Sequence, residues 1–322
     1  MSLLIYAESA DGKLKKVAFE LASYAKKVAE SLGTTVTAVT VNPGDVSELS
    51  KYGVDKVLKV TNDKLATFNA KAYADVIKQA AQKEGAKVIL LSSTTDSIYL
   101  APFVAVGLEA GFASNVVGLP LSTSPFQVKR NAFSNKAFNI TEISTDVKVL
   151  GLAKNSYGLV ESNSSLSTED FSPNLNDADF NVKVENVEKV TGKVTIADAE
   201  VVVSGGRGLK GPENWALVED LATVLGAATA CSKPVSDLGW RPHSEHVGQT
   251  GKPVATNLYI AIGISGAIQH IAGINSSKVK VVINSDPEAP FFKVADYGVV
   301  GDAFEIVPKL TQKLKDFKAQ NS

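Results

Sequence analysis

The sequence contains very little cysteine and histidine, and this scarcity excludes several kinds of site. Its 322 residues include one cysteine, Cys231, so neither an intrachain disulfide framework nor a cluster held by several thiolates can form. A single thiol without a partner is typical of a reducing compartment. The three histidines, His243, His246 and His270, lie in the last third of the chain. None of them has metal-ligand spacing with another histidine or an acidic residue, so we predict no metal site.

Net charge and long apolar runs are also lacking. A formal net charge of -1 argues against nucleic-acid binding and against a basic membrane-binding surface. The longest apolar runs, such as residues 258–264, are far shorter than the roughly 20 residues of a membrane-spanning helix, so we expect no membrane insertion. The N-terminus shows neither a secretory signal nor an Arg-rich transit peptide. We therefore expect a cytoplasmic protein in a bacterium, or a mitochondrial-matrix protein if an organelle leader has been removed.

Strands and helices alternate in the first 110 residues. Apolar or β-branched runs predict strands at 3–7, 35–41, 56–60 and 88–92, and helical periodicity predicts helices at 13–32, 69–84 and 98–110. Three shorter strands, at 126–130, 136–141 and 147–152, follow without helices between them. Strands that are continuous apolar runs are typical of a parallel sheet covered on both faces. The first half therefore reads as a parallel-sheet α/β domain.

A change in composition marks the end of this domain. Residues 161–181 are rich in serine, asparagine and aspartate, which predicts a polar linker. Residues 182–185 then alternate between apolar and charged side chains, which predicts one strand that returns to the first sheet. We place an N-terminal scaffold and docking domain at 1–191 and a C-terminal domain at 192–322.

The C-terminal domain opens with a strand that runs into the GxGxxG motif Gly206–Gly211, and a helix is predicted at 214–225. This order is Rossmann-like. An acidic residue that binds ribose should follow about 20 residues later, but residues 227–234 contain none, so ordinary NAD binding is disfavoured. A pyridine-nucleotide oxidoreductase remains one alternative for the function, and a partner-binding module without a cofactor remains another. No GxxxxGK[ST] motif is present, which disfavours nucleotide hydrolysis.

The stretch from Val247 to Asn284 carries the strongest functional signal. It reads as a glycine-rich turn, a strand, a Gly/Ser turn, a short helix and a second strand. A glycine-rich turn between a buried strand and a helix presents backbone N–H groups that bind anions. The pattern therefore indicates a site for a phosphorylated cofactor.

Four blocks of sequence, at 202–210, 247–252, 258–270 and 284–298, resemble the electron transfer flavoprotein alpha-subunit family. The resemblance implies FAD in the C-terminal domain and a heterodimer with a beta subunit that usually holds AMP. It implies an electron carrier rather than a substrate-converting enzyme. Such a carrier takes electrons from dehydrogenases, such as the acyl-CoA dehydrogenases of fatty acid β-oxidation, and passes them to a quinone oxidoreductase or another acceptor.

The same resemblance implies a set of FAD-binding residues. They are Arg207, Gly208, Ser232, Lys233, His246, Gln249, Thr250, Gly251, Gly263, Ser265, Gly266, Gln269, His270, Asn284 and Asp302. Gly263 and Gly266 should let FAD approach the backbone, and Ser265 should bind a phosphate together with the first N–H groups of the following helix. Asn284 should reach the phosphates or the ribose.

The resemblance also implies how some of these residues act on the flavin ring. The Thr250 hydroxyl should form a hydrogen bond with flavin N5. His270 should reach the pyrimidine edge, where a charged histidine would stabilise the anion that forms on reduction. Lys233 stands where many members have an arginine, which keeps the charge but loses the planar fork. Asp302 matches an acid near the adenosine end of FAD, although it could also cap the last helix.

Overall fold

The computed structural model describes residues 2–187, 194–196 and 199–321 and divides into two compact units. Unit 1 comprises residues 1–133 and 137–187, and unit 2 comprises residues 134–136 and 188–322. The domain boundary predicted between residues 191 and 192 falls outside the described residues and stays a prediction. Each unit has its own β-sheet and its own buried apolar clusters. The chain is therefore a mixed α/β protein.

Unit 1 is built on one large sheet with the strand order β10-β9-β7-β11-β6-β1-β4-β5-β12, and β8 pairs with β9. The run from β7 to β12 is parallel throughout, whereas β9 and β10 are antiparallel to their neighbours. The predicted parallel sheet is therefore confirmed. The strands are β1 (Ser2–Tyr6), β4 (Thr35–Val41), β5 (Lys56–Val60), β6 (Val88–Ser92), β7 (Gly111–Val116), β8 (Ser122–Thr123), β9 (Phe126–Ala132), β10 (Ala137–Ile143), β11 (Lys148–Leu152) and β12 (Ser167–Asp170), with a separate hairpin of β2 (Ser9–Ala10) and β3 (Lys13–Leu14).

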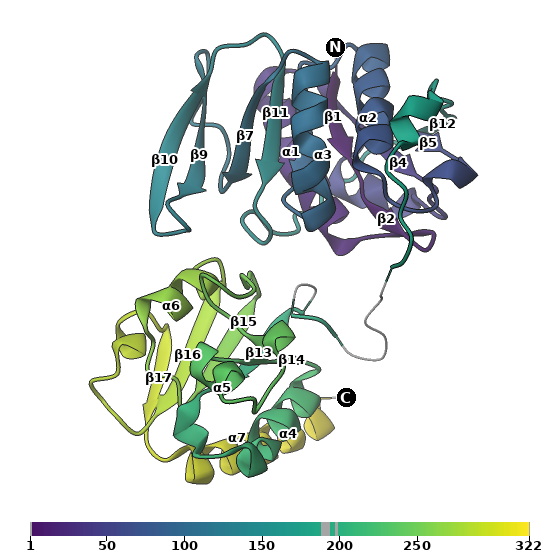
Figure 1. Ribbon diagram of the computed structural model, residues 1–322. Coiled ribbons are helices and arrows are strands. Elements are labelled where there is room, and N and C mark those ends of the chain that lie inside the picture. The colour runs from purple at the N-terminus through teal and green to yellow at the C-terminus, as the bar shows by residue number, and fades with distance from the viewer. Residues whose placement is uncertain (1, 188–193, 197–198, 322) are drawn as a thin grey trace. The chain divides into compact units, whose positions relative to one another are not determined.

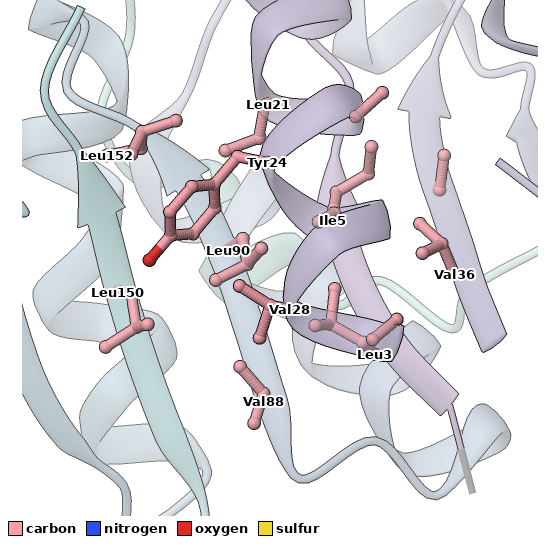
Figure 2. Close-up of a cluster of buried hydrophobic side chains, with 14 of the residues drawn as sticks. Leu3, Ile5, Leu21, Tyr24, Val28, Val36, Val88, Leu90, Leu150 and Leu152 are labelled. Carbon is pink, nitrogen blue, oxygen red and sulfur yellow. The ribbon is translucent and has the colours of Figure 1, made fainter. Parts of the chain in front are cut away.

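Helices cover both faces of the central strands (Figure 1). On one face lies α1 (Lys16–Leu32), and on the other lie α2 (Ala70–Glu84) and α3 (Thr95–Gly107). Figure 2 shows the cluster under α1, where the Tyr24 ring lies among aliphatic side chains from the strands. The Tyr24 hydroxyl donates to the backbone oxygen of Gly118 at 3.0 Å, so this large side chain is buried with its polar atom satisfied.

The stretch predicted as a polar linker is partly an edge strand. Residues 167–170 form β12 and pair in parallel with β5. The Glu169 carboxylate accepts from Lys56 and Lys83, each at 2.8 Å. β12 is exposed at the edge of the sheet, and hydrogen bonds and ion pairs hold it there. Its residues therefore need not be apolar, and the sequence shows no apolar run that would predict a strand. The strand predicted at 182–185 is not formed, and β12 is the segment that returns to the sheet.

Unit 2 contains a parallel sheet with the order β14-β13-β15-β16-β17. Its strands are β13 (Val201–Gly205), β14 (Ala228–Cys231), β15 (Leu258–Ile262), β16 (Val279–Asn284) and β17 (Tyr297–Val300), and its helices are α4 (Ala216–Leu225), α5 (Lys233–Asp237), α6 (Ile268–Ile274) and α7 (Ala303–Gln320). The strand order reverses direction between β13 and β15. In open parallel sheets, ligands bind outside the carboxyl ends of the strands at such a reversal.

Candidate functional site

The predicted FAD-binding residues lie at the carboxyl ends of the unit 2 strands and in the loop beside them. Arg207 and Gly208 follow β13, Ser232 and Lys233 follow β14, Gly263, Ser265 and Gly266 follow β15, Asn284 ends β16, Asp302 follows β17, and His246, Gln249, Thr250 and Gly251 lie on the loop that continues beside β14. Gln269 and His270 lie on α6. Because parallel strands end at the same edge of a sheet, these loops are neighbours.

Hydrogen bonds join neighbouring loops at this edge. The Gly208 N–H donates to the Gly263 oxygen at 3.0 Å, which links the loops after β13 and β15. The Ser232 N–H donates to the Gly205 oxygen at 3.1 Å. The Asn284 amide donates to the Ile264 oxygen at 3.0 Å, and its oxygen accepts from the Asp286 N–H at 3.0 Å. Asn284 therefore fixes two loops, and its predicted contact with the FAD phosphates or ribose stays a prediction.

The glycines at this edge are required by the packing of the backbone itself. A Cβ atom on Gly208 would lie 2.6 Å from the Gly263 Cα, and one on Gly266 would lie 2.6 Å from the Phe291 nitrogen. Gly263 and Gly266 also have φ values of +62° and +87°, which favour glycine. We expected these two glycines to admit FAD. The close approach of neighbouring backbone is a second reason for glycine at these positions, and their contact with FAD stays a prediction.

The GxGxxG motif does not open a helix. Residues 207–209 form a single 3-10 turn, and α4 begins only at Ala216. A second 3-10 turn at residues 212–214, with Gly211 as its N-cap, leads into α4, so the α-helical N-terminus lies five residues after the last glycine of the motif. This geometry adds to the missing ribose acid as an argument against a standard pyridine-nucleotide site.

The loop from His246 to Gly251 packs against α6. Val247 donates to the Cys231 oxygen at 3.0 Å, and Gln249 donates to the Gln269 oxygen at 2.7 Å. A Cβ atom on Gly251 would lie 2.4 Å from the His246 oxygen, so the turn closes tightly on itself. The side chains of Gln249 and Thr250 remain exposed at its tip. The loop thus presents polar side chains on a fixed backbone.

His270 is buried behind this loop. Its Nε2 lies 2.9 Å from the Tyr259 hydroxyl, and its side chain packs near the Phe291 ring. Burial lowers the pKa of His270 to about 4, with a smaller opposing effect from the Val247 backbone. The imidazole is therefore uncharged near neutral pH in the chain alone, and its charged role beside the reduced flavin stays a prediction. Its Nδ1 has no partner of normal hydrogen-bond geometry among the described residues.

The sequence analysis missed Tyr259. This residue is fully buried on β15, in a strand that is otherwise aliphatic. Burial raises the pKa of Tyr259, so its hydroxyl keeps its proton at neutral pH. A tyrosine in such a strand needs a polar partner for its hydroxyl, and this requirement was the available signal. The partner is His270.

His246 is the second buried histidine at the site. Burial, and to a smaller extent the neighbouring His243, lowers the pKa of His246. Its Nδ1 also has no hydrogen-bond partner within the described part of the chain. A Cβ atom on Gly248 would lie 3.3 Å from the His246 Nε2 and 3.7 Å from the His270 Cα, so the two histidines flank this glycine.

Two charged residues make local contacts instead. The exposed Lys233 forms an ion pair with Asp237 at 3.2 Å. The Asp302 carboxylate accepts from the Phe304 N–H at 2.9 Å and caps α7. The helix cap stated for Asp302 is formed through Oδ1, and the role beside the adenosine end of FAD, which the other carboxylate oxygen could fill, stays a prediction. Arg207 is exposed on the turn after β13.

The edge as a whole fits a large ligand with hydrogen-bonding groups and negative charge. Its exposed side chains include the cations Arg207 and Lys233 and the polar residues Gln249, Thr250 and Ser265. Two buried imidazole nitrogens lack partners close to the same loop, and buried polar atoms normally find one. Among the described residues, no group of three or more side chains could hold a metal ion, and no helix could span a membrane.

Comparison with known proteins assigns the family. The family model for the electron transfer flavoprotein domain matches residues 3–179, and the model for the electron transfer flavoprotein FAD-binding domain matches residues 195–275. The alpha subunit from Bacillus subtilis is 35% identical over 316 residues and covers 97% of both chains. The alpha subunit from Syntrophomonas wolfei is 38% identical over 318 residues and covers 97% of this chain and 98% of its own.

A probable mitochondrial alpha subunit from Caenorhabditis elegans is 34% identical over 313 residues, which is 97% of this chain and 93% of its own. The two family models together span both units, and the second one names FAD as the cofactor. The chain belongs to the electron transfer flavoprotein alpha-subunit family and binds FAD.

Proposed function

We propose that the chain carries electrons as one half of a heterodimer with an electron transfer flavoprotein beta subunit. It would accept electrons from dehydrogenases, such as acyl-CoA dehydrogenases, and pass them to a quinone oxidoreductase or another acceptor. The beta subunit would hold AMP. The chain itself would be a carrier rather than a substrate-converting enzyme, with an N-terminal docking domain and a Rossmann-like FAD-binding domain.

One observation carries the cofactor assignment to particular residues. The His270 imidazole is buried, with Nε2 2.9 Å from the Tyr259 hydroxyl, and its Nδ1 makes no hydrogen bond of normal geometry among the described residues, although the Val247 backbone interacts with the ring. Because the pKa of Tyr259 is raised, its hydroxyl stays protonated and can donate to Nε2. In the tautomer that accepts from Tyr259 at Nε2, the imidazole proton is on Nδ1, which becomes a donor held in place by a second side chain.

FAD supplies the redox chemistry when it is bound. The residues of this chain would hold and orient it: Arg207 and Lys233 by charge, and Gln249, Thr250, Ser265 and Gln269 by hydrogen bonds. Ser232, His246 and Gly251 would shape the adjoining loops. The His270 Nδ1–H would donate to an acceptor of the flavin ring. Asn284, Asp302, Gly208, Gly263 and Gly266 would act through the loops that they fix.

The test is co-expression of the chain with its beta subunit, followed by measurement of flavin content and of visible spectra during stepwise reduction. We expect about one FAD bound in unit 2 per heterodimer, and bleaching of its absorbance when an acyl-CoA dehydrogenase and its substrate are added. A colourless heterodimer that cannot be loaded with FAD would refute the proposal. Tight binding of NAD by such a heterodimer would support the pyridine-nucleotide alternative.

A further inference from the structure

A buried ion pair lies just before the loop of residues 246–251, which carries several of the predicted FAD-binding residues. The Arg241 side chain is 19% exposed, and the Glu245 side chain is 17% exposed. Arg241 Nε donates to Glu245 Oε2 at 2.9 Å, and Arg241 Nη2 donates to Glu245 Oε1 at 2.7 Å. Two charge-assisted hydrogen bonds of this kind fix the relative position of both side chains. We call the pair the Arg241–Glu245 clamp.

The clamp is attached to α4 and, through Trp215, to the sheet of unit 2. Arg241 Nη1 donates to Glu219 Oε1 on α4 at 3.2 Å. The Arg241 guanidinium also lies over the Trp215 ring, 5.4 Å from its centre, which is within the range of a cation–π contact. Trp215 is buried, and a Cβ atom on Gly205 at the end of β13 would lie 2.6 Å from its ring. Arg241 therefore rests on a side chain that packs directly against the sheet.

The segment that the clamp closes is not an α-helix. Pro242 has an extended backbone, with φ -64° and ψ 152°, and residues 243–245 form a single 3-10 turn. The four-residue spacing of Arg241 and Glu245 is therefore not the regular spacing of a helix face. The ion pair holds this turn closed through its side chains, directly before the 246–251 loop begins.

The 246–251 loop presents its polar side chains beyond two backbone anchors. The Val247 N–H donates to the Cys231 oxygen at 3.0 Å, and the Gln249 N–H donates to the Gln269 oxygen at 2.7 Å. The side chains of Gln249 and Thr250 are exposed. Because a side chain follows the backbone that carries it, their positions depend on the conformation with which the chain enters the loop. That conformation is the one that the clamp fixes.

We propose that Arg241 is a positioning residue for FAD. Through the clamp and its contacts with Glu219 and Trp215, it fixes the start of the 246–251 loop and thereby the side chains that hold the flavin. Because the two charges of the clamp are opposite and in contact, it acts through the position of the loop rather than through an electric field at the flavin. This assignment rests on the proposed contacts of the loop with FAD and adds the residue that supports them.

Amide hydrogen exchange tests the clamp separately from FAD chemistry. Arg241→Ala is compared with Asp296→Ala in the heterodimer with the beta subunit, before and after removal of FAD. Asp296 is a matched control, because its carboxylate accepts from the Lys280 N–H at 2.7 Å and lies 3.9 Å from the Lys280 ammonium, at the opposite, amino end of β16. Exchange of the β15 amides reports global unfolding in both variants.

The two anchoring amides of the loop give the decisive signal. In Arg241→Ala, the N–H groups of Val247 and Gln249 should exchange about 10-fold faster relative to β15, the factor that corresponds to losing one charge-assisted hydrogen bond. In Asp296→Ala, the same ratio should stay at its wild-type value. Equal ratios in the two variants would overturn the proposal.

A second variant separates the clamp from the packing of Arg241 on Trp215. Glu245→Gln keeps the size of the side chain and leaves Arg241 beside Trp215 and Glu219, but it removes the charge that makes the pair bidentate and strong. If the clamp fixes the loop, Glu245→Gln should speed the exchange of the same two amides about as much as Arg241→Ala. A loop with wild-type exchange in Glu245→Gln would mean that Arg241 supports only α4, and the proposal would be wrong.

The visible spectrum and the rate of FAD release connect the loop to the cofactor. In Arg241→Ala, FAD should dissociate about 10-fold faster and the flavin absorbance bands should shift, whereas Asp296→Ala should change neither. Faster loop exchange with unchanged FAD release and spectrum would overturn the positioning role together with the proposed contacts of Gln249 and Thr250. Unchanged loop exchange in a heterodimer that holds FAD normally would overturn the role of Arg241 alone.

Discussion

Lowering the pH from 7.5 to 5 should destabilise unit 2 in part through His270. Burial lowers its pKa from an ordinary value of 6.5 to about 4. In the unfolded chain the imidazole takes up a proton as the pH falls through 6.5, whereas in the folded chain it stays neutral until about pH 4. The unfolded state therefore gains protons first, and stability is lost as the pH falls.

The pKa difference sets the size of the effect. One pKa unit corresponds to about 1.4 kcal/mol, so the full difference is about 3 kcal/mol, of which about 2 kcal/mol should be lost by pH 5. The variant His270→Gln cannot titrate, so its free energy of unfolding should fall by about 2 kcal/mol less over the same range. The contribution of His246, whose pKa is also lowered, is present in both proteins and cancels in the difference.

Tryptophan fluorescence during urea unfolding is a suitable assay. Both tryptophans of the chain, Trp215 and Trp240, lie in unit 2, so the signal reports the unit that contains His270. Parallel pH profiles for the wild-type chain and His270→Gln would refute the reasoning. Such a result would mean that the imidazole is solvated or already charged in the folded chain.

Three further predictions concern a glycine turn, a helix cap and a buried tyrosine of unit 2. Gly263→Ala should lower the free energy of unfolding by about 2 kcal/mol or more, because φ is +62° and the new Cβ would lie 2.8 Å from the Gly208 Cα. The control is Gly226→Ala, where φ is +64° but the new Cβ would lie in open space. In urea unfolding, this control should cost only about 1 kcal/mol. Asp302→Ala should cost about 1 kcal/mol by removing the α7 cap, with flavin content unchanged if the carboxylate does not contact FAD. Tyr259→Phe should cost about 1–3 kcal/mol, because it leaves His270 Nε2 unpaired, and the same assay would detect a neutral effect.

The sequence predicted the parts of the fold that follow from apolar runs and helical periodicity. The strands β1, β4 and β6 of unit 1 are almost entirely buried and read directly as apolar or β-branched segments. β12 could not be predicted in this way, because its stability comes from pairing with β5 and from ion pairs to Glu169. Local composition and periodicity do not reveal interactions between residues that are distant in the sequence.

The same distinction holds at the site. The strand-and-turn pattern placed the loops that we predict to bind FAD at strand ends, and the structure has these loops at strand ends. It did not show which residues face each other across loops. Gly208 and Gly263 are 55 positions apart in the sequence, yet each is glycine because of the other. Likewise, the state of His270 depends on Tyr259, which the motif does not single out.

The burial of His270 limits how the residue can respond to charge. Raising its pKa from about 4 to 7 would require about 4 kcal/mol of favourable interaction with its protonated form. A single negative charge about 4 Å away supplies about that much at the effective dielectric constant of a protein surface site. A neutral ligand supplies far less. His270 should therefore be a neutral hydrogen-bond donor beside an uncharged ring and become charged only beside an anion. Tyr259 keeps the ring in place in both states, because its hydroxyl can donate to a neutral Nε2 or accept from a protonated one.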